Sequence, residues 1–385
     1  MQYPKAGTSM HQHHLATAPA PGLSQTTRAV FFALLCALAI AAMGARSAHA
    51  ADADEGDFEL TLQKTDTLIG IGRRLLIDPN RWPDLQKRNN IADPLRLTPG
   101  SIMVIPRALL RIDPAEVVVR NVIGPASRAD GTPLVANERL AEGVTVKTAD
   151  NGYVTLQLID GSTVRVQSRS ELKVERARRV PGSQVTDTQI EMNSGKAEVQ
   201  FKPAARKTSR FEIRTGFASA AVRGTEFRVT ADARGTRSEV VEGGIAFAGI
   251  PAGASQPSAA DVVAVREGFG SLVDDTRKPI PPVQLLAAPF LPKPQVMQPA
   301  PNFRLRFPPI TGAARYRVTL AADESMQQVR REQYFDQPDI SFPNMNPGKY
   351  VLQVRAIDKF GLEGRDARVP LTMIGVQPAP APAAP

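Results

Sequence analysis

Residues 153–166 read YVTLQLIDGSTVRV, and their pattern is repeated through the largest part of the chain. From Tyr153 to Leu158, apolar and polar side chains alternate, which is typical of a strand with one buried face. Asp160-Gly161 is a hairpin signal, because these residue types adopt the backbone conformations that tight turns require. Ser162 to Val166 resumes the alternation. The stretch therefore predicts a β-hairpin.

The same alternation continues on both sides of this hairpin, from Ala115 to about Asp275, and no amphipathic helix interrupts it. The alternating apolar positions are Val144/Val146, Leu172/Val174, Ile190/Met192, Ala197/Val199/Phe201, Phe211/Ile213, Phe227/Val229 and Ile245/Phe247. Short strands in such a series, without helices between them, favour an antiparallel all-β domain over residues 115–275.

Four motifs in this region resemble the FecR family: Asp150 to Val164, Ser194 to Val199, Gly224 to Val229 and Val240 to Ile245. The resemblance implies a periplasmic β module that receives an envelope signal and controls a sigma factor through a cytoplasmic arm. Only residues 1–28 precede the first apolar run, too few for a folded cytoplasmic domain. The sigma-factor role is therefore not transferred to this chain.

The region before the β domain, residues 58–106, predicts a small α+β unit with the order βααβ. Phe58 to Leu62 alternates like a short strand, and Thr65-Asp66 provides N-cap residues for a helix with apolar residues at helical spacing. Trp82 to Asn89 predicts a second helix, and Ser101 to Pro106 a closing strand. We assign Trp82 to the core.

Residues 58–106 resemble the LysM domain in four motifs, at Thr65 to Leu68, Trp82 to Leu85, Asn89 to Pro94 and Pro99 to Pro106. The resemblance implies binding of N-acetylglucosamine-containing glycan, which is peptidoglycan in bacteria, in a groove between two loops. The groove residues that it implies are Thr65, Asp66, Thr67, Leu68, Asn90, Ile91, Ala92 and Asp93. The alternative is that Asp66 and Thr67 only cap the helix and that Leu68 only fills the core.

Residues 1–50 have the features of a secretory signal peptide, with an apolar run from Ala29 to Met43 and a small-residue cleavage site at Ala48-His49-Ala50. The alternative is an uncleaved anchor. Residues 51–57 form a short polar lead. All four histidines and the only cysteine, Cys36, lie in residues 1–50. The mature chain would therefore lack the residues for Ser-His-Asp or Cys-His catalysis, histidine zinc sites and disulfides.

The formal net charge of +9 falls to +6 on cleavage, because Lys5, Arg28 and Arg46 leave and no acidic residue does. A basic surface suits anionic envelope partners, whereas nucleic acid is not expected as a partner of an exported protein. We expect neither cofactor nor metal. A carboxylate-based wall hydrolase is the one catalytic alternative, and no segment looks like its catalytic domain.

The C-terminal part begins with a proline-rich stretch, residues 276–301, which predicts a semi-rigid linker. Residues 302–374 alternate again, in Phe303 to Phe307, Tyr316 to Leu320 and Tyr350 to Ala356, and predict a β-sandwich. The segment resembles a fibronectin type III module, although the usual early tryptophan is replaced by Phe307. Residues 375–385 are expected to be a disordered tail, because proline and alanine alternate from Gln377 to Pro385.

Together these features predict a multi-domain, mainly β, non-enzymatic protein of the periplasm or cell envelope, with no membrane span after signal cleavage. The LysM-like domain would bind peptidoglycan, and the two β modules would face another envelope or outer-membrane protein. Two alternatives stay open: a FecR-type sensor or regulatory protein that relays an envelope signal, and an accessory factor for surface-polymer export.

Overall fold

The computed structural model describes residues 57–183, 185–201, 209–222, 224–292 and 295–375. The chain is 49% strand and 7% helix, which confirms the predicted multi-domain, mainly β class. All of the described residues belong to one compact unit. The predicted signal peptide and almost all of the predicted tail lie outside the described residues.

The N-terminal part has the predicted βααβ order. Its elements are β1 (Phe58–Thr61), α2 (Leu68–Leu75), the 3-10 turn η1 (Pro79–Arg81), α3 (Trp82–Arg88) and β2 (Ile102–Ile105). β1 and β2 pair antiparallel, with Phe58 opposite Ile105. Helix α2 begins at Leu68 because the Thr67 hydroxyl accepts a hydrogen bond from Gly70 N at 3.1 Å. Its apolar face, which includes Ile71, is buried in the core of this domain.

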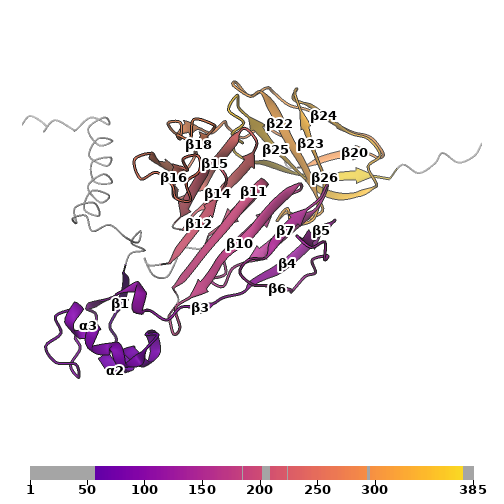
Figure 1. Cartoon of the computed structure of the whole chain (residues 1–385). Coiled ribbons are helices and arrows are strands. Elements are labelled where there is room, and N and C mark those ends of the chain that lie inside the picture. The colour runs from indigo at the N-terminus through magenta and orange to yellow at the C-terminus, as the bar shows by residue number, and fades with distance from the viewer. Residues whose placement is uncertain (1–56, 184, 202–208, 223, 293–294, 376–385) are drawn as a thin grey trace, which may run out of the picture. The chain divides into compact units, whose positions relative to one another are not determined.

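After the 3-10 turn η2 (Arg107–Leu109) the chain enters the central β domain (Figure 1). Its strands are β3 (Asp113–Pro114), β4 (Val117–Ile123), β5 (Ala126–Arg128), β6 (Arg139–Leu140), β7 (Thr145–Thr148), β8 (Tyr153–Gln157), β9 (Thr163–Val166), β10 (Ser170–Arg179), β11 (Thr186–Gln200), β12 (Arg210–Arg214), β13 (Ala218–Val222), β14 (Glu226–Asp232), β15 (Gly235–Glu242), β16 (Gly244–Gly249), β17 (Val262–Arg266), β18 (Phe269–Val273) and β19 (Val283–Gln284).

These strands form two sheets that share β11. The first sheet joins β10, β3, β5 and β7 to β12, β13, β16 and β17. The second sheet joins β4, β6, β8 and β9 to β14, β15, β18 and β19. Most neighbours are antiparallel, as predicted, but β11 and β12 run parallel.

Strand β11 passes from one sheet to the other at Gly195. Up to Ser194 it pairs with β10 of the first sheet, and from Gly195 onward it pairs with β14 of the second. Gly195 has a φ of 94°, and a Cβ at this position would lie 2.2 Å from the Ser170 hydroxyl oxygen. Glycine is therefore required where the strand bends. The sequence pattern had indicated two separate strands here, on either side of this residue.

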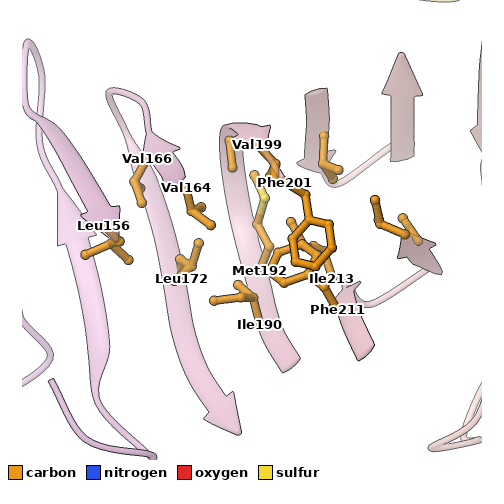
Figure 2. Packing of buried hydrophobic residues seen from close by; sticks show 14 of the residues in the cluster. Leu156, Val164, Val166, Leu172, Ile190, Met192, Val199, Phe201, Phe211 and Ile213 are labelled. Atoms are coloured by element: carbon orange, nitrogen blue, oxygen red, sulfur yellow. The ribbon is translucent and has the colours of Figure 1, made fainter. Parts of the chain in front are cut away.

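The main core lies between the two sheets. Figure 2 shows side chains from β8, β9, β10, β11 and β12 directed toward one another, including Leu156, Val164, Leu172 and Ile190. The rings of Phe201 and Phe211 stack with their centroids 5.1 Å apart. The alternating apolar positions named above are buried in this core or packed against it, so the predicted inward face of each strand is confirmed.

The C-terminal part has its own core between a five-stranded sheet and a two-stranded pair. Its strands are β20 (Val296–Pro299), β21 (Phe303–Arg306), β22 (Arg315–Ala321), β23 (Val329–Phe335), β24 (Asp339–Phe342), β25 (Gly348–Ile357) and β26 (Ala367–Ile374). The larger sheet has the order β20-β26-β25-β22-β23, and β21 pairs with β24. Phe303 and Phe342 stack across the pair, with centroids 6.2 Å apart. We call this part the C-terminal sandwich.

The proline-rich segment contributes to both β modules. Val283–Gln284 forms β19, which pairs with β18 of the central domain. Val296–Pro299 forms β20, which pairs in parallel with β26 of the sandwich, and Leu291 is buried in the sandwich core. The segment therefore does not hold the two modules apart at a distance. The sandwich instead packs directly against the outer face of the second sheet.

Candidate functional sites

The two loops predicted to form the glycan groove lie next to each other. Leu68 N, at the start of α2, is 3.5 Å from Pro94 O in the loop after α3. A hydrogen bond between Gln86 Nε2 and Ile91 O, at 3.0 Å, holds the second loop against α3. The fold thus places the two predicted segments side by side.

Within the first loop, three of the four predicted residues have structural roles. The Asp66 carboxylate is buried, accepting a hydrogen bond from Gln63 N at 2.8 Å and one from Arg74 at 3.0 Å. Thr67 caps α2, and Leu68 is fully buried. Thr65 is exposed. Asp66 therefore stabilises the loop conformation from its buried side, and Thr65 is the one exposed side chain among the four predicted residues of this loop.

The second loop is more open. Asn90, Ala92 and Asp93 are exposed, and Ile91 is half-buried against the core. Asn90 adopts a φ of 52°, a conformation that asparagine tolerates better than most residues. Asp93 accepts a hydrogen bond from Leu95 N at 2.9 Å, which shapes the turn. Thr65, Asn90 and Asp93 could thus contact a sugar with polar side chains.

A second cluster of polar residues joins the central domain to the sandwich, and the sequence analysis did not predict it. The outward-facing residues of the second sheet are polar, as in a solvent-exposed face, yet the sandwich covers them. Lys196 of β11 donates to the Tyr334 hydroxyl of β23 at 2.8 Å. Thr155 of β8 donates to Gln327 at 2.7 Å. Arg237 of β15 donates to Phe360 O at 2.8 Å.

Glu363 lies at the centre of this interface, in the turn between β25 and β26, and is 3% exposed. Its carboxylate accepts hydrogen bonds from Arg317 Nη1 at 3.0 Å and from Arg355 Nη1 at 2.9 Å. Lys196 Nζ, from the central domain, also bonds to it. Burial alone would raise the pKa of Glu363, but the charges of Arg317, Lys196 and Arg355 outweigh burial and hold the pKa well below its usual value.

The same cations bind further carboxylates on both sides. Arg355 donates to Glu198 of the central domain at 2.7 Å, and Arg317 donates to Glu332 of the sandwich at 2.6 Å. Arg228 of β14 donates to the Asp366 carboxylate at 2.7 Å. These contacts form a continuous network of buried charges in which each guanidinium faces at least one carboxylate, as burial of charge requires.

One carboxyl group in this network carries no salt bridge among the described residues. Glu239 of β15 is fully buried; its Oε1 accepts a hydrogen bond from Glu363 N at 3.1 Å, whereas its Oε2 has no partner among the described residues. Burial, and then the neighbouring charge of Glu363, raise the pKa of Glu239 to about 7. Glu239 is therefore a titratable group inside the interface.

Comparison with known families bears on the central domain. Residues 144–246 match the family described as FecR protein. This part of the chain is a FecR domain, as the motifs in the sequence indicated, and it contains β7 to β15 and the first half of β16. A comparison with curated proteins found no match. The LysM-like and fibronectin-like assignments are not shown by any comparison and remain predictions.

Solved structures show only weak similarity. A crystal structure of a candidate anti-sigma factor from Parabacteroides distasonis shares 18% identity, with a TM-score of 0.28 over 36% of this chain and 59% of that chain. A beta-1,2-glucanase from the same organism shares 13% identity, with a TM-score of 0.19 over 68% of this chain and 37% of that chain. TM-scores this low do not establish a shared fold, and no function follows from them.

Proposed function

We propose that this chain is an exported, non-catalytic regulatory protein of the cell envelope that recognises another envelope protein through its FecR domain. The FecR match over residues 144–246 carries the proposal. The signal-peptide features of residues 1–50 are consistent with export. Within the described residues, no helix has the length and apolar character needed to cross a membrane.

The arrangement of the two sheets indicates which face a partner would contact. The outer face of the second sheet is covered by the sandwich, whereas the outer face of the first sheet carries partly exposed charged side chains. Lys147, Glu171, Lys173 and Glu191 alternate in sign across neighbouring strands, with Glu171 opposite Lys147 and Lys173 opposite Glu191. A surface of this kind gives orientation and specificity to a protein partner that carries the complementary charges.

Site-specific photo-crosslinking in cells tests this proposal. A photoreactive residue at position 173 or at position 191, both on the outer face of the first sheet, should capture the same envelope protein. The control position is Asp336, which is 81% exposed on the sandwich. If positions 173 and 191 capture nothing, or capture the same products as position 336, the first sheet is not the recognition surface.

A second function, binding of peptidoglycan by residues 58–106, is supported by the contact between the two predicted loops. Co-sedimentation of the full chain with purified insoluble peptidoglycan, in moderate salt that screens loose charge interactions, is the test. We expect Thr65→Ala combined with Asn90→Ala to abolish sedimentation, because both side chains are exposed on the two loops of the predicted groove. Asp66 is a poor choice for this test, since its buried carboxylate holds the loop together.

The matched control for this experiment is Asp84→Ala, which changes a polar residue on α3 whose side chain is 47% exposed. This variant should pellet like the wild type. If the double variant also pellets like the wild type, the predicted groove does not bind the glycan, and either another part of the chain binds it or its basic surface does.

A further inference from the structure

A recess opens where the FecR domain meets the C-terminal sandwich. It encloses about 190 Å³, with one wall formed by β8, β9, β11 and β14 and the other by β25, β26 and the loop before β23. A water molecule occupies about 30 Å³ in the liquid, so there is room for several waters or one small molecule. Ligand pockets for drug-sized molecules are larger, at about 300–1,000 Å³.

The charged lining of this recess is unbalanced. Four arginines line it, and the carboxylates in its wall are Glu198 and Glu226. Arg228, Arg355 and Arg368 each bind Asp366, which lies behind the wall, at 2.7, 2.5 and 2.9 Å. Arg165 is different. Its only ion-pair partner among the described residues is Glu198, at 3.6 Å, which is longer than a normal hydrogen bond.

The guanidinium of Arg165 therefore has N–H groups that can donate hydrogen bonds to a ligand. Its side chain is 13% exposed, and no described residue accepts a hydrogen bond from its guanidinium. A guanidinium has five N–H donors in a planar fork that matches the two oxygens of a carboxylate or the oxygens of a phosphate. No nitrogen of Arg165 is among the buried atoms that lack a partner, so its unbonded N–H groups reach the solvent of the recess, where a ligand could replace water.

The remaining lining is suited to hydroxyl groups. Thr155, Thr163 and Gln200 come from the FecR domain, and Ser325 and Gln327 come from the sandwich. The hydrogen bond from Thr155 to Gln327 already joins the two walls at 2.7 Å. Hydroxyl and amide groups of this kind both donate and accept, as the hydroxyl groups of a sugar do.

We propose that this recess binds a small oxyanion of sugar size, a sugar acid or a sugar phosphate, with its anionic group on Arg165 and its hydroxyl groups on both walls. The ligand would contact the FecR domain and the sandwich together, and so would stabilise their junction by mass action. This site is separate from the outer face of the first sheet, and its test does not depend on finding a protein partner.

The experiment measures thermal unfolding and calorimetric binding of the purified full-length chain with three probes: glucuronate, glucose 6-phosphate and neutral glucose. The buffer is free of phosphate and contains about 0.15 M salt, so that loose surface association is screened. We expect at least one of the two anionic sugars to bind and to raise the midpoint, and glucose to do neither. The anion that binds identifies which of the two sources the site accepts.

Two variants locate the binding. Arg165→Gln should weaken it at least tenfold, and Gln200→Glu, which places a negative charge on an exposed residue of the recess and changes no buried side chain, should weaken it as well. The matched control is Arg306→Gln, which removes one charge from a side chain that is 76% exposed elsewhere on the sandwich. It should bind like the wild type.

Three results would overturn the proposal: no binding of either anionic sugar, equal binding of glucose, or full retention of binding in both single variants, Arg165→Gln and Gln200→Glu. Equal weakening in Arg306→Gln would count against it as well, because it would indicate general attraction to a basic protein. The protein-capture experiment at position 173 can fail without affecting any of these outcomes.

Discussion

Replacement of Glu363 by glutamine should destabilise the junction between the FecR domain and the sandwich more than any surface change. Glu363 is 3% exposed and accepts hydrogen bonds from Arg317, Arg355 and Lys196. Glutamine has nearly the same shape, but it removes the negative charge and presents an NH₂ group to one of the cations. Three positive charges would then remain buried around a neutral side chain.

The expected loss of stability depends on which other carboxylates the cations still contact in the variant. Breaking a buried ion pair by removing one partner typically costs about 3–5 kcal/mol. Here Arg317 retains Glu332 at 2.6 Å and Arg355 retains Glu198 at 2.7 Å, so we expect the lower end, about 3 kcal/mol. With an m-value of about 3 kcal/mol/M, the urea midpoint of the affected transition falls by about 1 M.

Urea unfolding followed by far-UV circular dichroism measures this change, because the β modules hold most of the strands. The single tryptophan of the chain, Trp82, lies in the N-terminal domain and supplies an internal control. The urea midpoint reported by Trp82 fluorescence should fall less than the midpoint reported by circular dichroism. Asp336→Asn, at a side chain that is 81% exposed, is the matched charge control and should shift stability by no more than about 0.5 kcal/mol.

A loss of stability below about 1 kcal/mol in Glu363→Gln, or a loss equal to that of Asp336→Asn, would contradict this prediction. It would mean that the buried carboxylate is not needed to neutralise its three neighbours. The junction would then depend on its other contacts, such as the bond from Thr155 to Gln327.

Three further predictions concern the central domain. Because burial raises the pKa of Glu239 from 4.5 to about 7, the folded chain keeps a proton that the unfolded chain loses, and stability should fall by up to about 3 kcal/mol as the pH rises from about 4.5 to 7. Urea titrations at a series of pH values should show this fall in the wild type and not in Glu239→Gln, and an unchanged pH profile in the variant would contradict the assignment. Gly195→Ala should lower the thermal midpoint, since it costs at least about 1–2 kcal/mol for the positive φ alone and its methyl group would also meet Ser170; a midpoint like that of the wild type would show that β11 bends elsewhere. Phe211→Ala should cost about 3–5 kcal/mol in chemical unfolding, because Phe211 is fully buried between Phe201 and Phe227, and a loss below 1 kcal/mol would be inconsistent with a packed core.

Local patterns predicted the inward faces of the strands well. Alternation at Val164 and Val166, or at Leu352 and Val354, depends only on the two-residue period of a strand and on the burial of one face. Helix α2 was likewise predictable from its cap and from its apolar spacing. These features are encoded within a few residues of each other.

The continuity of β11 was harder to predict, although a signal for it is present. The buried positions are Ile190 and Met192 before Gly195, but Ala197 and Val199 after it, so the inward face changes from even to odd numbers. Such a change of phase is what a bend between two sheets produces, because the inward side of the strand reverses relative to the chain. When only the alternation of apolar and polar residues is considered, this pattern indicates two short strands.

The candidate sites likewise include features that local sequence patterns predict and features that depend on distant contacts. The groove residues of the N-terminal domain lie in adjacent loops, as the LysM resemblance implied, but the buried state of Asp66 follows from its contact with Arg74, which no local pattern shows. The charged network at Glu363 depends on contacts between residues more than a hundred positions apart, such as Lys196 with Glu363. A single amino-acid sequence holds no local signal for such pairs.

The register of the sandwich explains why carboxylates gather at its junction with the FecR domain. Arg317 of β22 lies directly opposite Arg355 of β25, and like charges placed opposite each other destabilise a sheet. Both side chains are nearly fully buried, so water cannot screen them, and carboxylates are needed to neutralise them. The sandwich itself supplies three of them, Glu332, Glu363 and Asp366, and the FecR domain supplies a fourth, Glu198. Both arginines are therefore paired within the sandwich, and Arg355 is also paired across the junction, so we expect the sandwich and the FecR domain to respond to a partner as one body.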